Sequence, residues 1–529
     1  MQFTVQGKSF MPMGGQAHNS SAYNAEELAS AIAGVKALNG NTLEAPVYWE
    51  QVEPAEGQYD FTPLDMLIAE CRKNELHLIV LWFATWKNGE MRYVPEWVKS
   101  ASKRFWRVQR SDGASIQVLS AYCTETQQAD ARAFRALMEH LKKTDGKMQT
   151  VIAVQVQNEP GILGSDRDYS PQAEAAFQAP VPTELLAFIQ KLGKGQAWEA
   201  WQRSGAVQQG NWQALFGLRG GEFCTAWSVA KYIDAVAAAG REAYAIPLYV
   251  NAWLGSPGWE IPGFYPSGGP VWRTLDIWKC AAPHIDLIAP DIYIANFNDY
   301  RTVCADYCRP DNPLFVPESG ANGMNARNML RALADFNALG YFCFGVDSIL
   351  DMEGNLRQEA AAFVESFRSV MGILPLLQKY QGSGRIQAVV EEEHQTNQCF
   401  EFERYLGAVP FINVGGWSEN KDHRHRRNPG LTAGLPRYGL IIEAGPGEFY
   451  LAGNFHLFMV PNQSPQWNDA MKMPFIMTPV DYLTVEEGRL TPDGDFVPVR
   501  VRNGDEAVFG GFWASPACGV VRIRLTPEA

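Results

Sequence analysis

Hydrophobic and polar positions along the first part of the chain alternate between a helical period and short apolar runs typical of buried strands. Residues 23–38 carry apolar side chains every three to four positions, with Asn24 as the candidate N-cap and Asn39-Gly40 as a stop signal. Residues 10–20 and 41–49 flank this helix as strands. A second helix at 61–74 and a third strand at 76–83 follow, so the order predicts a parallel sheet with helical crossovers.

The same alternation continues to about residue 347 and supplies further helices and strands. The remaining strands are predicted at 151–157, 247–253, 285–293, 313–319 and 340–347, and further helices at 127–143 and 326–339. Eight strands is the number that closes a (β/α)8 barrel, so we assign residues 1–374 to a TIM barrel, an α/β fold. A helical insertion at 161–246 follows the fourth strand, and we expect it to rise over the C-terminal face of the barrel, together with residues 84–125.

The pattern changes around residues 374–384, where helical periodicity gives way to short alternating runs separated by turn signals. Such runs are typical of an antiparallel β-sandwich, which we assign to residues 375–529. The 529 residues are 46% hydrophobic and 19% charged, a globular composition that suits two or more domains.

The charge balance bears on partners and compartment. A net charge of -13 argues against nucleic acid and anionic membranes as partners. No apolar run approaches the roughly 20 residues needed to span a bilayer, and no signal peptide is visible, so we expect a cytoplasmic protein. A homo-oligomer is left open.

Nine cysteines are too sparse for a disulfide scaffold, and their number is odd. Cys71, Cys224, Cys280 and Cys343 are predicted to be buried free thiols in a reducing compartment. Cys304 and Cys308 are four positions apart and could bind a metal, but no Cys-x2-Cys or histidine pair accompanies them, so unpaired thiols are favoured. We therefore expect neither metal nor cofactor.

Two glutamates end predicted strands on opposite sides of the barrel mouth. Glu159 follows the fourth strand and precedes Pro160-Gly161, and Glu318 ends the seventh. Two carboxyl groups that converge there are what retaining glycoside hydrolysis needs: one transfers a proton and the other attacks the anomeric carbon. Asn-Glu-Pro alone is a common turn sequence, but its pairing with a second glutamate on strand seven is much less ordinary.

Neighbouring residues suggest a carbohydrate or glycoside as the substrate. Asn158 could bind a sugar hydroxyl, and Tyr293 could hold Glu318 ionised, although either could instead make a structural contact at the barrel rim. Aromatic side chains near the strand ends could stack on a sugar ring, although each alone is more often a core residue. The remaining candidates for substrate binding are Gln16, His18, Trp49, Trp86, Lys87, Asn251 and Trp253.

Several long motifs resemble known glycosidases. Residues 41–61 are similar to the second-strand signature of family-35 and family-42 β-galactosidases. Other stretches resemble a divergent bacterial branch of glycoside hydrolase family 35, and the last of them lies in the predicted sandwich. These stretches are residues 18–21, 81–88, 166–170, 265–270 and 503–506.

This resemblance implies a retaining exo-β-galactosidase with Glu159 as acid/base and Glu318 as nucleophile, and it implies no metal for the chemistry. The chain departs from the pattern at Thr85 and Gln157, where relatives carry glutamates. Two alternatives stay open. One is a retaining glycosidase for another sugar, such as a β-fucoside, α-L-arabinopyranoside, β-glucoside or plant glycoside, and the other is a carbohydrate-binding protein without turnover.

Overall fold

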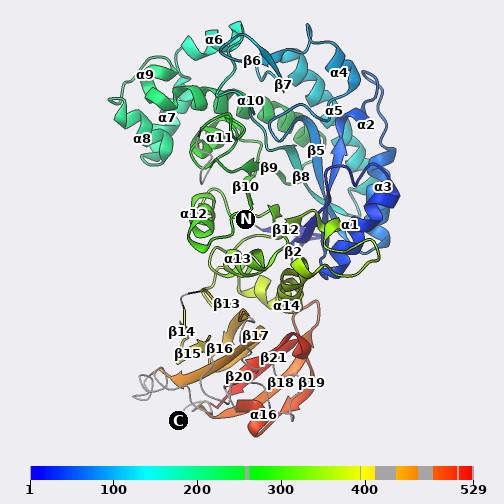
Figure 1. The fold of residues 1–529 in the computed structure, drawn as a ribbon, viewed down its shortest axis with the longest axis vertical. Helices are drawn as coiled ribbons and strands as arrows, with labels where there is room; N and C mark the ends of the chain where they lie inside the picture. The colour runs from blue at the N-terminus through cyan, green and yellow to red at the C-terminus, as the bar shows by residue number, and fades with distance from the viewer. Residues whose placement is uncertain are drawn as a thin grey trace.

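The computed structural model describes residues 2–255, 261–393, 395–411, 436–462, 480–508 and 511–526. A barrel occupies the N-terminal part of the molecule, and an antiparallel sheet domain lies beyond its far end (Figure 1). A short hairpin of β1 (Phe3–Val5) and β2 (Lys8–Phe10) precedes the barrel.

The eight predicted strands form one parallel sheet in the order β11-β10-β9-β8-β5-β4-β3-β12. A parallel bridge between Val316 and Tyr341 joins the two ends, and Phe342 N donates to Val316 O at 2.9 Å. The barrel prediction is therefore confirmed. The strands are β3 (Met13–Gln16), β4 (Thr42–Tyr48), β5 (His77–Lys87), β8 (Val151–Asn158), β9 (Leu248–Trp253), β10 (Leu287–Ile292), β11 (Glu318–Ser319) and β12 (Tyr341–Phe344).

Helices surround the barrel, and local chemistry fixes their ends. The Asn24 side chain caps the first helix by accepting from Glu27 N at 3.0 Å. The helix predicted to run to residue 339 stops at Ala334, because Asn337 takes a left-handed conformation (φ 53°) and the apolar Ala338 and Leu339 are buried in the connection instead. The surrounding helices are α1 (Ala25–Ala37), α3 (Thr62–Lys73), α5 (Thr124–Asp145), α10 (Gly220–Ala243), α11 (Leu275–Ala281), α12 (Phe297–Tyr307) and α13 (Gly323–Ala334).

The insertion after the fourth strand is shorter than predicted. Residues 220–243 form α10, which packs along α5 and serves as the crossover helix of the fourth unit, so the added segment ends near Arg219. It contains α6 (Pro171–Gln178), α7 (Thr183–Leu192), α8 (Gln196–Arg203), α9 (Trp212–Phe216) and η1 (Gly217–Arg219). The segment after β5 holds α4 (Glu96–Ser100) and the hairpin of β6 (Arg107–Gln109) and β7 (Ser115–Leu119), while α2 (Trp49–Val52) follows β4.

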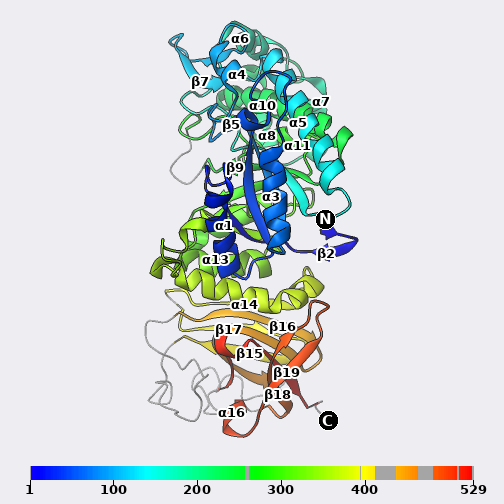
Figure 2. The ribbon, with the colours of Figure 1, turned by 90° about the vertical axis from the view of Figure 1, so that its right-hand side faces the viewer.

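Helix α14 (Gln358–Tyr380) lies between the barrel and the sheet domain (Figure 2). The predicted boundary at 374/375 falls inside it. Pro375 sits within the helix, where a proline more often marks an end, and the buried Leu374, Leu376 and Leu377 continue its apolar face. By length and composition this helix could cross a membrane, but it packs against α13 on one side and β16, β17 and β18 on the other.

The C-terminal domain has the antiparallel strands expected of the predicted β-sandwich, and they are connected in one sheet of nine strands. Its longest strand, β17, pairs with β16 and β21 through its first half and with β15 and β20 through its second half. Side chains of β16 alternate: Leu440 and Ile442 join the core shared with the barrel, and Ile441 joins a second core inside the domain.

The strands of this domain are β13 (Ile386–Val390), β14 (Asn397–Glu401), β15 (Tyr405–Pro410), β16 (Tyr438–Gly445), β17 (Glu448–Pro461), β18 (Tyr482–Leu490), β19 (Phe496–Arg502), β20 (Phe512–Ala514) and β21 (Val520–Leu525). Short helical turns lie at η2 (Val346–Ser348), α16 (Asp505–Val508) and η3 (Pro516–Cys518).

The cysteines predicted to be free thiols form no disulfides, although Cys280 is only partly buried. Cys304 lies buried on α12 and Cys308 ends that helix. Neither belongs to a cluster of three or more metal-ligand side chains among the described residues.

Candidate active site

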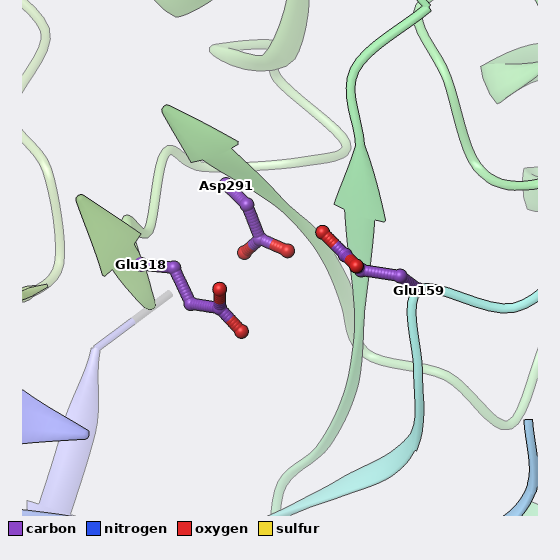
Figure 3. A group of neighbouring side chains, drawn as sticks. All are labelled: Glu159, Asp291 and Glu318. Atoms are coloured by element: carbon purple, nitrogen blue, oxygen red, sulfur yellow. The ribbon is translucent and has the colours of Figure 1, made fainter. Parts of the chain in front are cut away.

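Three acidic side chains converge at the C-terminal ends of the barrel strands (Figure 3). Glu159 follows β8, Asp291 lies near the end of β10, and Glu318 begins β11. Each is buried, and each offers one oxygen that lies within 4.8 Å of an oxygen of the other two. The two predicted glutamates therefore meet, and they meet with a third acid that the sequence analysis did not single out.

The chain turns sharply to aim Glu159 into this space. Gln157 and Glu159 both have positive φ, 67° and 44°, a conformation that side chains other than glycine adopt only under constraint. Glu159 N donates to Asn251 Oδ1 at 2.8 Å, and Glu159 O accepts from Gly89 N at 3.0 Å. These contacts hold the backbone in the turn that presents the carboxyl group.

A buried network behind the strand ends supports the same turn. Asp130 on α5 accepts from Trp82 Nε1 at 2.9 Å, Thr85 Oγ1 at 2.6 Å and Gln157 Nε2 at 2.7 Å. The Oε1 atom of Gln157 in turn accepts from Trp86 N at 3.0 Å. Burial raises the pKa of Asp130 to about 6, although its hydrogen-bond donors lower it. Thr85 and Gln157 therefore hydrogen-bond to Asp130, and neither lines the cavity.

Glu318 receives four side-chain hydrogen bonds. Gln16 Nε2 donates to its Oε1 at 2.9 Å, and Tyr293 OH donates to its Oε2 at 2.7 Å. The Nδ2 atoms of Asn158 and Asn251 approach Oε1 at 3.3 and 3.4 Å. Donors stabilise a carboxylate in its charged form, so this set favours an ionised Glu318.

Glu159 has the opposite surroundings. Burial raises its pKa to about 7, and the charge of Glu318 adds to that rise. Lys87, a hydrogen bond with Asp291 and the Nδ2 donor of Asn88 lower the pKa and limit the shift. Hydrogen-bond donors thus gather around Glu318, whereas burial and the charge of Glu318 raise the pKa of Glu159 to about 7.

The acids face a cavity of about 610 Å³ that combines polar and apolar walls. This volume is within the range of small-molecule sites. Its other lining residues are Asn19, Lys87, Asn88, Trp253, Leu254, Tyr293, Ile294 and Phe344. The cavity can therefore hold a ligand with both hydroxyl groups and an apolar face.

The other predicted binding residues divide into three groups. Gln16, Asn158, Asn251 and Tyr293 contact Glu318, and Lys87 and Trp253 line the cavity. Three others, Trp49, Trp86 and His18, are not among the residues that line the cavity.

Trp49 is fully buried, donates to Glu53 at 2.8 Å and packs against Trp97. Trp86 is fully buried against Tyr232. His18 approaches Ser348 Oγ at 2.7 Å and is not among the residues that line the cavity. Among the aromatic residues near strand ends, Trp49 and Trp86 thus pack in the core, whereas Trp253 and Tyr293 line the cavity.

Asp291 and Asn88 were the residues that sequence reasoning missed. Asp291 stands two positions before Tyr293, and side chains two apart along a strand share a face, so this spacing could have indicated it. Asn88 adjoins Lys87, but no strand pattern covers it, since it lies in a turn with φ 55°.

Comparison with known proteins shows which families parts of this chain resemble. Residues 2–245 match the model of glycosyl hydrolases family 35, and residues 363–513 match a domain of unknown function (DUF5597). A β-galactosidase from Xanthomonas manihotis is 28% identical over 186 residues, which cover 33% of this chain and 28% of that relative's length. The chain therefore aligns with little more than a quarter of that relative, and the resemblance to family 35 is confirmed for the N-terminal half.

One solved structure supports the fold, and a second has a slightly lower TM-score. The catalytic domain of β-amylase from Paenibacillus polymyxa has a TM-score of 0.50 at 13% identity, covering 68% of this chain and 98% of that one. A β-galactosidase from Halorubrum lacusprofundi has a TM-score of 0.49 at 16% identity, covering 68% of this chain and 58% of that one. The first likeness shows a shared barrel fold and nothing further about activity.

We expect Gln157→Glu to destabilise the protein by about 3 kcal/mol at pH 8 and by much less at pH 5, because it places a second buried carboxylate against Asp130. Combining it with Asp130→Asn should recover part of the loss, since the pair then again contains one acid and one amide. Urea unfolding of the single and double variants measures this coupling. The control is Gln128→Glu, because Gln128 is exposed and lies on α5, the helix that carries Asp130. Independent, additive effects would contradict the assigned contact.

Glu159→Gln should raise the thermal midpoint, and more so as the pH rises from 5 to 8. The pKa of Glu159 is raised from 4.5 to about 7 in the folded protein, so its stabilising contribution is complete below about 4.5 and is lost as the pH passes 7. Glutamine does not titrate, and the gain should be on the order of a few degrees at pH 8. Calorimetry across this pH range tests it, and a gain independent of pH would argue against the raised pKa.

Proposed function

From the resemblance of residues 2–245 to glycosyl hydrolases of family 35, together with the paired glutamates, we propose that this protein is a retaining glycosidase that removes terminal β-D-galactose. The observation that carries the proposal is the contrast between Glu318, which receives four hydrogen bonds, and Glu159, whose pKa is about 7. A nucleophile and a proton donor need these opposite states.

In the first step, Glu318 attacks the anomeric carbon while Glu159 gives its proton to the departing glycosidic oxygen. A covalent glycosyl-enzyme results, and the aglycone leaves as an alcohol. In the second step, Glu159 takes a proton from water, the water oxygen bonds to the anomeric carbon, and Glu318 is released. Two inversions leave the configuration unchanged.

The separation of the two acids supports retention over inversion. Their nearest oxygens lie within 4.8 Å, whereas inverting enzymes place the carboxyl groups about 6.5–9.5 Å apart to admit a water molecule. The cavity of about 610 Å³ around them supports action on a terminal sugar. Support for galactose comes from the relative, whose name is β-galactosidase.

Glu159→Ala and Glu318→Ala should each lower kcat on aryl β-galactosides by at least about 10³-fold, because each removes one of the two groups that act in both steps. Azide should restore turnover in both variants with an activated leaving group. NMR of the product should then show the inverted glycosyl azide only from Glu318→Ala, and the retained one from Glu159→Ala.

Wild-type turnover in either alanine variant would refute these roles. Tight binding of galactosides without any hydrolysis by the wild-type protein would instead indicate a carbohydrate-binding protein. A panel of nitrophenyl glycosides, including β-fucoside, α-L-arabinopyranoside and β-glucoside, decides which sugar the protein prefers.

The kcat/KM of the wild-type protein should fall as the pH rises above about 7. Glu159 must carry its proton to assist departure of the aglycone, and its pKa is about 7. Initial rates on a nitrophenyl galactoside between pH 4 and pH 9 measure this alkaline limb. A limb near the ordinary glutamate pKa would show that Glu159 is not the proton donor.

A further inference from the structure

Asp291 is a third acid within the cavity, and the two-step reaction does not use it. It is 3% exposed on β10, and Figure 3 shows its carboxyl group between those of Glu159 and Glu318. Its Oδ2 accepts from Asn251 Nδ2 at 2.7 Å. Its Oδ1 meets no N–H or O–H donor among the described residues, although it is buried.

The number of donors limits how many of these acids can be ionised. Glu318 has four side-chain donors, whereas Glu159 has Asn88 and Asp291 has Asn251. Lys87 is the one cation among the described residues that line the cavity. Three carboxylates within 4.8 Å cannot all be charged in a buried space, because like charges at that range repel strongly. The acids with the fewest donors must hold a proton.

The contact between Glu159 and Asp291 indicates where one proton lies. Their side chains hydrogen-bond to each other, and two carboxyl oxygens can do so only if one of them is protonated. Burial raises the pKa of Asp291 well above its usual range, and the charges of Glu318 and Glu159 add to this. The same hydrogen bond lowers the pKa of Glu159. Asp291 Oδ1 is buried and meets no donor among the described residues, whereas Glu159 Oε2 already accepts from Asn88 Nδ2, so this geometry places the proton on Asp291, which donates it toward Glu159.

We propose that Asp291 is a positioning residue that remains a neutral carboxylic acid and donates a hydrogen bond to Glu159, fixing the direction of the proton donor. Asn251 links the two, since its Oδ1 accepts from Glu159 N and its Nδ2 donates to Asp291. A buried carboxylic acid kept neutral to act as a donor is known chemistry. The inference rests on the proposed function, because it assigns Asp291 its effect through Glu159.

The donor also keeps Glu159 suited to both steps. Without it, burial and the charge of Glu318 would act on Glu159 with less opposition, and its proton would be held more tightly. A donor that releases its proton too reluctantly is a poor acid in the first step. The titratable groups that interact with Asp291 are Glu159, Glu318, Lys87, Tyr249, Tyr293 and Tyr307.

The test compares Asp291→Asn with Asp291→Ala. Asparagine can donate to Glu159 through its amide while its oxygen accepts from Asn251, so it should retain kcat within about tenfold and keep the alkaline limb of the wild-type pH profile. Alanine removes the donor, so kcat should fall by about 10²-fold. Its alkaline limb should move to higher pH, because the influence that lowered the pKa of Glu159 is gone.

The opposite pattern would overturn the proposal. If Asp291 were ionised, its removal would lower the pKa of Glu159, and both variants would move the limb to lower pH and lose similar activity. Asp306→Asn is the matched control, since it neutralises a partly buried acid on α12 that does not line the cavity. Circular dichroism confirms that each variant is folded before its rates are compared.

A spectroscopic measurement separates this inference from the proposed function. The infrared difference spectrum of wild type minus Asp291→Asn at pH 7 should show the carbonyl band of a protonated carboxyl group, whether or not the protein hydrolyses galactosides. A carboxylate band there would refute the neutral state of Asp291. Absence of glycosidase activity together with the protonated band would refute the function and leave the assignment of the proton intact.

Discussion

Two like acids share one buried space and must stay in opposite protonation states, and much of the barrel mouth is arranged around that constraint. Repulsion between buried carboxylates raises the cost of ionising the second once the first is charged. The number of hydrogen-bond donors determines which acid ionises first. Four side chains donate to Glu318, namely those of Gln16, Asn158, Asn251 and Tyr293. Glu159 is left to burial, and its pKa rises accordingly.

Further buried acids lie below and behind this pair. Glu44 inside β4 accepts from Tyr249 OH at 3.0 Å, and burial raises its pKa well above the usual range. Asp130 on α5 accepts hydrogen bonds from two strands, from Trp82 and Thr85 on β5 and from Gln157 on β8. These groups show that the barrel interior contains carboxyl groups in a neutral or partly neutral form, each with a specific donor. Thr85 and Gln157 stand where related glycosidases carry glutamates. Both side chains hydrogen-bond to Asp130, so their lack of charge does not alter the acids that line the cavity.

The sequence predicted the features that periodicity and strand order determine. The eight strands and the convergence of Glu159 with Glu318 followed from alternation and from the rule that strand ends meet at one face. The cavity-lining roles of Trp49 and Trp86 did not follow, because a tryptophan at a strand end is equally suited to packing, and both fill the core here. The end of the barrel unit was misplaced because Pro375 lies inside α14, where the neighbouring helices and strands keep the helix continuous. The spacing of Asp291 from Tyr293 could have placed it at the site, but its protonation depends on side chains from other strands, such as Asn251, which no local pattern reveals.

Helix α14 packs against both the barrel and the sheet domain and joins them through one apolar core. One face of the helix completes the barrel core and its other face covers Leu440, Ile442 and Tyr450 of the sheet, so the barrel core continues across the helix onto the sheet. Separating the two parts would expose a broad apolar surface on whichever fragment kept the helix and another on the fragment that lost it. The sheet domain is thus not a detachable appendage: shuffling it between homologous barrels would require that α14 travel with residues matched to both neighbours.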